Sequence, residues 1–337
     1  MADADELELL RATVSGALSS GASLSDLAQL GLLGLLVPED VGGSGWCPIE
    51  AVAVALEAGR HTGERGPEHG VRTSNGTPWL EVSLAAMALA GGGDDVRREW
   101  LDSTLAGSRT VVVADAALVG AAHALVNGTI PGVVGKADAV VVELEGRFLL
   151  VPRRAPGVEV AADPTSIDLS LPAESWSLSG AEPIELAGSI PAEVVVVRRV
   201  LAAASLLGLL SGALERLVPY LSDRIAFGSH VASFQAIQHR IVDLFLLEVR
   251  SRVTIEAAAR SLVAPSPDTS RLAAAAHGFV AAQVPEALDE CIQLTGGIGF
   301  TWEYPLHHEL RRAVALAAAC GGPPESRRSF ALAGAHG

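Results

Sequence analysis

The sequence is poor in aromatic residues, in basic residues and in cysteine. Aromatics make up 4% of 337 residues, and 24 Lys and Arg stand against 39 Asp and Glu, which gives a formal charge of −15. This balance argues against a nucleic-acid partner and against attachment to an anionic membrane, because both need clustered cations. The cysteines Cys47, Cys291 and Cys320 are scattered without a CxxC pair. We therefore expect neither a disulfide framework nor a zinc site.

Long hydrophobic runs and a basic leader are also missing. The mean hydropathy is +0.36, yet the best apolar stretch, Val200–Leu214, is followed by Glu215 and Arg216. It is shorter than the roughly 20 residues that a membrane span needs. Residues 1–14 are acidic where a secretory signal would be basic. We therefore expect no membrane span and a cytoplasmic location.

What the sequence does contain is a large share of small apolar residues. Hydrophobic residues reach 49%, chiefly Ala, Leu and Val, a composition typical of helix–helix packing. Helical patterns at both ends flank short β-branched runs, with no βαβ rhythm, which predicts an α+β, mostly α fold. We expect a helical domain over residues 1–108, a reduced central β-domain over 109–191 and a helical bundle over 192–337.

Local patterns predict the individual elements. Ser23 and Asp26 form the signature of a capped helix start. Helices are expected at Ile49–Gly59, Trp79–Ala90, Asp94–Leu105, 200–222, 234–262, 270–294 and 306–319, and strands at Val111–Ala114, Ala139–Glu143, Arg147–Val151 and Val158–Val160. Asn127-Gly128, Glu145-Gly146 and Pro156-Gly157 read as turns, Gly63–Thr77 as a surface loop, and Ser329–Gly337 as a frayed tail.

The first candidate site is the segment Gln293–Pro305, with the sequence QLTGGIGFTWEYP. Gly296 and Gly297 allow the backbone to approach a ligand closely. Glu303 lies between two aromatic residues, and a partly desolvated carboxylate has a raised pKa that suits a catalytic base. The alternative is a solvated Glu303 at the start of the next helix, where acidic residues are favoured.

The second candidate site follows the first long helix of the C-terminal region. Arg224 lies beside a glycine break and can reach a phosphate, and Gln235 offers both donors and acceptors. In the alternative, Arg224 pairs with Asp223 or another neighbour. Phe227 and Phe234 then belong to the core.

The other polar motifs point to no further chemistry. His307 and His308 are adjacent, which does not suit zinc, so we expect a solvated or capping pair. Arg153 and Arg154 are expected to be surface charges rather than clamps for CoA, although an anionic ligand could use one of them. A G-x-S-x-G elbow and a Ser/His/Asp arrangement are absent from the sequence, so a hydrolase has no support.

Together these segments resemble the acyl-CoA dehydrogenase family. The resemblance lies in RxxFG from Arg224, FQ at Phe234, QxxGGxGFTxEYP from Gln293, the following Arg311-Arg312, and GLLGLLVPEDVGGSG over Gly31–Gly45. Their order and spacing agree with the family from about residue 5 to about 320. The resemblance implies an N-terminal helical domain, a central β-domain and a C-terminal four-helix bundle, usually assembled as a dimer of dimers.

The resemblance also implies FAD as cofactor, with its adenosine arm extending to a neighbouring subunit. Arg224 would meet the pyrophosphate, Phe227, Phe234 and Gln235 would line the same arm, and Gln293, Gly296 and Gly297 would contact the adenine–ribose end. Glu303 falls on one of the family's two positions for the catalytic base. The other position aligns with Arg198, a cation, and Arg199 matches an arginine near the acyl pocket, a substrate-binding role.

Two segments depart from the family pattern. Ala114-Asp115-Ala116 stands where the family has Thr-Glu-Pro, and Asn127–Asp138 lacks the Trp of a Trp-Ile-Thr element. In the family both segments hold the isoalloxazine ring. The segment Cys320–Arg328 also replaces a GTSEIQR-like run. The flavin-ring contacts are therefore the weakest part of the resemblance.

Three functions remain open at this point. The first is α,β-desaturation of an acyl-CoA thioester in lipid or steroid metabolism, with FAD as hydride acceptor, Glu303 as base and an electron-accepting flavoprotein as partner. The second is a non-catalytic subunit that completes the FAD site of a homologous partner in an α2β2 heterotetramer. The third is a flavin-free family member recruited to another acyl reaction.

Overall fold

The computed structural model describes residues 4–62, 77–115, 118–122, 125–171, 173–188 and 191–334. It is mostly helical with a small strand region, so the predicted α+β fold class is confirmed. The chain forms two compact units. Unit 1 comprises residues 1–10, 20–51 and 75–198, and unit 2 comprises residues 11–19, 52–74 and 199–337. The three-domain division stays a prediction.

The elements follow one another in the expected order of helices, strands and helices. The first helices are α1 (Ala4–Ser20), α2 (Leu24–Gln29), α3 (Pro48–Arg60), α4 (Trp79–Ala90), α5 (Asp94–Val96) and α6 (Asp102–Leu105), with a π-helical turn at Arg97–Leu101. The strands are β1 (Val111–Ala114), β2 (Leu118–Ala122), β3 (Leu125–Val134), β4 (Ala139–Leu144), β5 (Arg147–Pro152), β6 (Val158–Ala162), β7 (Ala173–Ala181) and β8 (Ile184–Glu185). Then come α7 (Pro191–Asp223), the short strands β9 (Ile225–Ala226) and β10 (Ser229–His230), α8 (Gln235–Val263), α9 (Thr269–Thr295), α10 (Leu306–Ala317) and α11 (Gly322–Gly334).

Unit 1 is built around two four-stranded sheets, ordered β1-β4-β5-β8 and β2-β3-β7-β6. Strand β1 reads VVVA and is buried along its whole length, as expected of a strand covered on both faces. It runs parallel to β4 with Val111 opposite Ala139, and β4 runs antiparallel to β5 with Ala139 opposite Pro152. This register brings the residues before β1, before β4 and after β5 to one end of the sheet.

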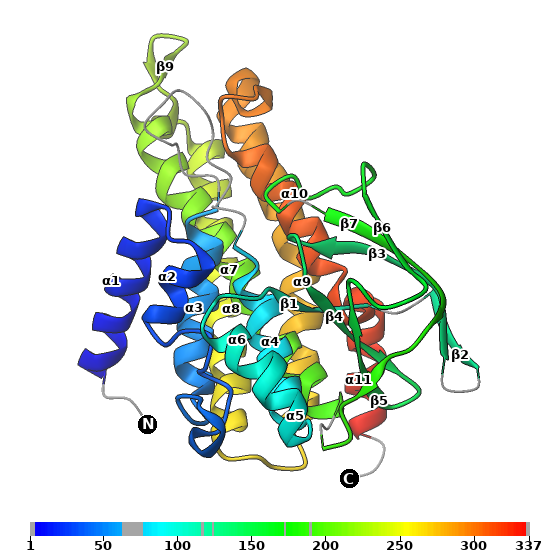
Figure 1. Ribbon diagram of the computed structural model, residues 1–337. Coiled ribbons are helices and arrows are strands. Elements are labelled where there is room, and N and C mark those ends of the chain that lie inside the picture. The colour runs from blue at the N-terminus through cyan, green and yellow to red at the C-terminus, as the bar shows by residue number, and fades with distance from the viewer. Residues whose placement is uncertain are drawn as a thin grey trace. The chain divides into compact units, whose positions relative to one another are not determined.

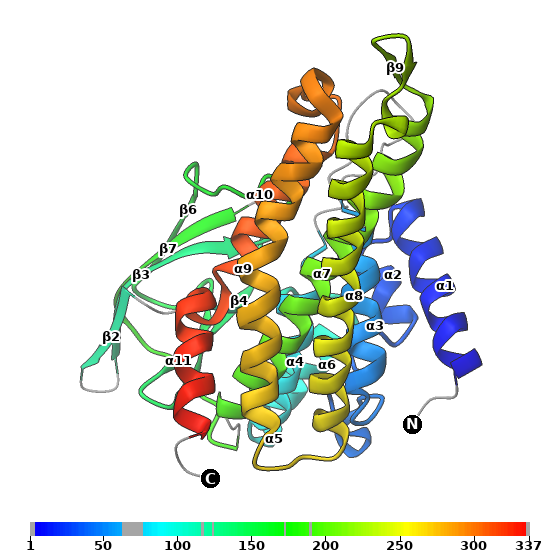
Figure 2. The same cartoon turned by 180° about the vertical axis from the view of Figure 1, so that it is seen from behind.

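Unit 2 is a set of packed helices in which α9 contacts α8, α10 and α11 (Figures 1 and 2). Helix α7 is buried throughout residues 199–214, the stretch richest in Ala and Leu. Its Gly208 allows a close crossing with α3, because a Cβ there would lie 2.0 Å from the carbonyl oxygen of Leu56. The small residues therefore act in helix–helix packing, as the composition indicates.

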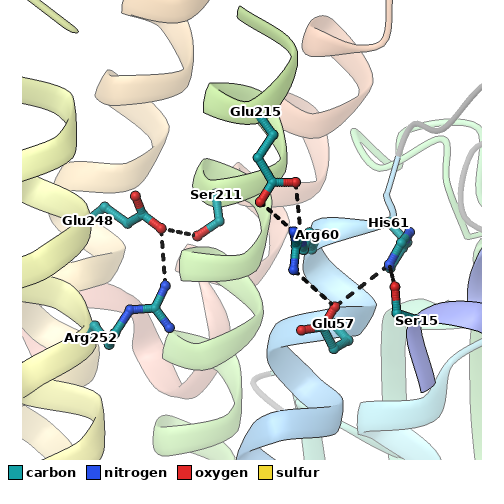
Figure 3. A network of polar contacts seen from close by, with 8 residues as sticks. All are labelled: Ser15, Glu57, Arg60, His61, Ser211, Glu215, Glu248 and Arg252. Carbon is teal, nitrogen blue, oxygen red and sulfur yellow. Dashed lines mark hydrogen bonds and ion pairs between the residues drawn. The ribbon is translucent and has the colours of Figure 1, made fainter. Parts of the chain in front are cut away.

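A polar network joins the helices of unit 2 beside this crossing (Figure 3). On α3, Arg60 donates from Nε to Glu215 of α7 at 2.9 Å. On the other side of α7, Ser211 donates to Glu248 of α8 at 2.7 Å. A further bond at 2.7 Å joins Ser15 of α1 to His61, which follows α3. Four helices are thus tied together by polar groups at the margin of an apolar core.

Two predictions were wrong. Asn127-Gly128 is not a turn but lies inside β3, where Gly128 stands opposite Leu178 of β7. Most of the tail predicted as frayed belongs to α11, whose Ser326 is fully buried and bonds His277 of α9 at 2.8 Å. In both places long-range packing overrides the local signal. The loop predicted at Gly63–Thr77 falls almost entirely outside the described residues.

Helix α7 is also longer than the apolar stretch seen in the sequence. Among the described residues, Ala192–Asp223 is the helix long and apolar enough to cross a membrane by length and composition. Of its most apolar window, 83% is buried inside the protein, as in the core helix of a folded domain.

Candidate functional site

At one end of unit 2, Arg224 is held against the chain that leaves α9. Its Nη1 donates to the carbonyl oxygen of Thr295 at 2.6 Å and to the hydroxyl of Tyr220 at 2.5 Å. Gly296 follows directly with φ +74°, and a Cβ there would lie 3.2 Å from Nη1 of Arg224. The structure therefore brings together two of the seven predicted cofactor residues. Of the alternative partners, Asp223 forms no bond with this guanidinium among the described residues, whereas the neighbour Tyr220 does.

The hairpin β9–β10 extends the same end of unit 2. Its turn contains Phe227 at φ 54°, which is 100% exposed. The amide of Val231, after the hairpin, donates to the carbonyl oxygen of Arg224 at 2.9 Å. Phe234 directly precedes α8 and Gln235 begins it, and both are exposed. The core alternative for the two phenylalanines is therefore wrong.

Gln293 and Gly297 lie on the α9 side of this end, and both are exposed. A Cβ on Gly297 would meet open space, so its backbone is accessible to a ligand. We call the seven residues the arginine end of unit 2: Arg224, Phe227, Phe234, Gln235, Gln293, Gly296 and Gly297. Six of them are exposed and Gly296 is half-buried.

Glu303 lies in the turn between the 3-10 turn Gly296–Phe300 and α10. Its side chain is exposed and so is that of Trp302, whereas Tyr304 is buried. This geometry matches the solvated alternative. A role for Glu303 as base stays a prediction.

One turn further on, α10 buries charge that the sequence interpretation missed. Glu309 is fully buried and forms an ion pair with Arg216 of α7. Burial raises the pKa of Glu309 to about 7, against the opposing effect of Arg216. His308 is buried as well, so, of the expected solvated or capping pair, the solvated alternative is wrong for this residue. The sequence does carry a signal for this burial, because the helical spacing from Leu306 puts Glu309 on the apolar face of α10.

In unit 1, the chain leaving β1 carries a different charged pair. Asp115 follows β1 directly, and its carboxylate accepts from both terminal nitrogens of Arg198 of α7, at 2.7 and 3.1 Å. The Asp115 side chain is 56% exposed and that of Arg198 is 14% exposed. This ion pair joins two positions that each depart from the family pattern.

Arg199, the predicted substrate-binding residue, turns into unit 2. It is 5% exposed and donates from Nη2 to the hydroxyl of Ser329 on α11 at 2.9 Å. Within the described residues, its buried Nε has no hydrogen-bond partner. The structure therefore places this cation against α11 and apart from the arginine end.

Comparison with known proteins agrees with this architecture. The family "Acyl-CoA dehydrogenase, N-terminal domain" matches residues 11–108, and "Acyl-CoA dehydrogenase, C-terminal domain" matches residues 190–335. The chain is 27% identical over 300 residues to the acyl-CoA dehydrogenase IpdE2 of Mycolicibacterium smegmatis, covering 89% of this chain and 83% of that protein. It is 31% identical over 302 residues to FadE34 of Mycobacterium tuberculosis, covering 88% of this chain but 40% of that protein.

Solved structures share the fold at lower identity. A variant of the Tcur3481-Tcur3483 steroid ACAD superposes with a TM-score of 0.85 at 23% identity, covering 98% of both chains. The ChsE4-ChsE5 complex from Mycobacterium tuberculosis gives a TM-score of 0.81 at 23% identity, over 100% of this chain and 99% of that chain. With both helical regions matched, the chain belongs to the acyl-CoA dehydrogenase family.

Proposed function

We propose that this chain serves α,β-desaturation of an acyl-CoA thioester as one subunit of a mixed acyl-CoA dehydrogenase, and that it completes FAD held mainly by a homologous partner. The ion pair between Asp115 and Arg198 carries the proposal. By the family pattern, Asp115 stands in a segment that holds the isoalloxazine ring, and Arg198 stands at a position for the catalytic base. Here the Asp115 carboxylate and the Arg198 guanidinium are paired with each other.

In the described part of the segment that would hold the flavin ring, Asp115 does not fit the ring. The carboxylate of Asp115 is occupied by a bidentate guanidinium, a strong and directional contact. Replacing it with a ring would leave the largely buried Arg198 without its carboxylate. We therefore derive no chemistry at this end of β1.

The arginine end of unit 2 does fit the pyrophosphate and adenosine part of FAD. Arg224 is fixed by Tyr220 and Thr295, so little entropy is lost when its remaining donors bind an anion. Gly296 fits because a Cβ there would crowd that guanidinium. When bound, FAD supplies the hydride acceptor of the reaction. In the proposed assembly Arg224 would hold the pyrophosphate, and Gln235 and Gln293 would bind the adenosine arm.

An apolar stripe on α8 supports assembly with a homologous subunit. Five exposed side chains follow the i, i+3, i+4, i+7, i+11 spacing of one helix face: Val242, Phe245, Leu246, Val249 and Val253. Contiguous exposed apolar surface of this kind marks interaction sites. The Tcur3481-Tcur3483 and ChsE4-ChsE5 complexes are similar proteins made of two unlike chains. A steroid-like acyl group, an electron-accepting flavoprotein and a cytoplasmic location belong to the same proposal.

The test is co-expression with a homologous acyl-CoA dehydrogenase subunit, followed by measurement of flavin absorbance and desaturation activity. Arg224→Ala should lower the flavin content of the purified assembly by about tenfold, because a charge-assisted contact to a phosphate is lost. Arg271→Ala is the matched control, since Arg271 pairs with Asp268 near the opposite end of α9. Equal flavin content in both variants contradicts the proposal.

The alternative is a chain that holds a whole site, with Glu303 as the base. The place of Glu303, just after the glycine-rich turn and on one of the family's two positions for the base, favours it. Under this alternative the isolated chain binds FAD, and its desaturation activity depends on Glu303.

A further inference from the structure

A hollow of about 910 Å³ lies in unit 1, at the end of the sheet opposite Asp115. The register explains which residues meet there. Because Val111 stands opposite Ala139 and Ala139 opposite Pro152, the chain before β1, before β4 and after β5 converges at this end. At about 3.3 Å per residue, the six steps from Arg109 to Asp115 put the hollow roughly 20 Å along the chain from the proposed ring segment.

The three converging segments each bring basic side chains to the hollow. They are Arg109, Lys136, Arg153 and Arg154. Lys136 is the only lysine in the sequence, and the protein as a whole carries a charge of −15. Four of 24 basic residues thus line one hollow of an acidic protein. This concentration does not follow from composition.

Two of these cations are held rigidly by their neighbours. Arg109 lies over the ring of Trp100 at 4.6 Å and donates to the carbonyl oxygen of Glu99 at 3.1 Å. Arg153 makes two bonds to Glu174, at 2.6 and 2.9 Å. Guanidinium groups that are already held in place lose little conformational entropy when a ligand binds beside them.

The other two cations are available. Lys136 and Arg154 are exposed, and within the described part of the chain neither has a hydrogen bond or an ion pair. The hollow also holds the carboxylates of Glu99 and Asp138. Asp138 accepts from the amide of Thr110 at 2.9 Å, and Glu99 lies 3.7 Å from Arg109. With Glu174, which binds Arg153, three carboxylates stand near four cations, and Lys136 and Arg154 are the two cations whose side chains pair with none of them in the described part of the chain.

The remaining lining is apolar. Val158 and Val160 of β6 and Ile184 of β8 form part of the wall. A ligand that matches both the basic side chains and the apolar lining has an anionic group and a flat or apolar body. Phosphate is favoured over a single carboxylate, because it carries more charge and more acceptors for several cations.

We propose that this hollow binds a phosphate-bearing organic anion through Lys136 and Arg154, beside the fixed cations Arg109 and Arg153. None of its lining residues belongs to the arginine end of unit 2, so it stands or falls independently of the proposed function. Under this proposal unit 1 has a ligand site in the hollow, although the segment after β1 holds no flavin ring.

Lys136 allows a direct test, because an amine-acylating reagent can modify only this side chain and the chain's terminal amine. Acylation at low salt is followed by mass spectrometry, with ADP, inorganic pyrophosphate or adenosine present. ADP and pyrophosphate should slow modification of Lys136 at least fivefold relative to the terminal amine, and neutral adenosine should not. The same protection is expected in Arg224→Ala, where the proposed FAD contact is removed. Unchanged acylation with both phosphates, or equal protection by adenosine, overturns the proposal.

Calorimetric titration with ADP is a second test of the same proposal. Arg154→Gln should weaken the binding that remains in Arg224→Ala by about tenfold, since one phosphate contact is lost. Arg147→Gln is the matched control, because Arg147 is an exposed arginine at the other end of β5, paired with Glu185 at 3.2 Å. Equal weakening by Arg147→Gln would show general charge attraction and overturn the assigned site.

Discussion

Helix α7 supplies one arginine ion pair to each unit, and the two pairs lie in opposite surroundings. In unit 1, Arg198 meets Asp115, whose side chain is 56% exposed. In unit 2, Arg216 meets Glu309, which is 0% exposed and keeps one oxygen without a partner among the described residues. The same chemistry therefore carries little desolvation cost in one place and a large one in the other.

The two ion pairs therefore have different roles. The buried pair fixes α10, the helix that follows the Glu303 turn, to α7. Under the proposed function, the exposed pair occupies the segment that is expected from the family resemblance to hold the flavin ring. The pair at the first place serves the fold, whereas the pair at the second fills a position that the proposed function no longer uses.

The largest expected effect comes from breaking the buried pair. Arg216→Met leaves Glu309 buried without its cation, and we expect a loss of about 3–5 kcal/mol in the free energy of unfolding at pH 8. Urea denaturation followed by circular dichroism measures this loss. A cost no larger than that of Arg198→Met would contradict the comparison.

The second effect is a pH dependence. The folded pKa of Glu309, about 7, lies above its ordinary value of 4.5. The folded state therefore holds the proton more tightly, and the contribution of Glu309 to stability is present below pH 4.5 and lost as pH rises to 7. We expect the free energy of unfolding to be up to about 2 kcal/mol lower at pH 8 than at pH 5 through this group.

Glu309→Gln removes that titration. Urea denaturation of both proteins at the two pH values isolates the difference, because all other groups are shared. If the variant keeps the full pH dependence, Glu309 is not its source.

A smaller effect is expected at the exposed pair. Arg198→Met should lower the free energy of unfolding by about 1 kcal/mol or less, because water solvates the released Asp115. The flavin content of the co-expressed assembly should stay unchanged. A loss of flavin in this variant would place Arg198 in the cofactor site and contradict the proposed function.

The smallest effect is expected at Glu303. Glu303→Gln changes an exposed side chain, so the free energy of unfolding should stay within about 0.5 kcal/mol. The desaturation rate of the co-expressed assembly should also stay within twofold of the unmodified assembly. Loss of that rate, with flavin retained, would identify Glu303 as the base and favour the chain with a whole site.

Much of the fold could be predicted where local and long-range preferences agree. Trp79–Ala90, the run Asp94–Leu105 and Val111–Ala114 were each predicted with the bounds that the structure has. Ser23 and Asp26 form the expected capping box. Asn127-Gly128 was mispredicted because its turn propensity is outweighed by pairing on both sides, with β2 and β7.

The candidate site was less predictable, because its key contacts join distant parts of the chain. Asp115 and Arg198 were each singled out, but nothing in their local sequence shows that they form a pair 83 residues apart. Glu309 and Arg216 are 93 residues apart. The helical pattern could have placed Glu309 on an apolar face, but only the packing of α10 identifies its partner.

Under the proposed function, this chain lacks a flavin-ring site of its own. The most direct measurement is the bound flavin of the chain purified alone, after incubation with excess FAD and removal of the free cofactor. We expect a colourless protein without stoichiometric flavin absorbance, and recovery of flavin only when a homologous subunit is present. About one flavin per isolated chain would contradict it.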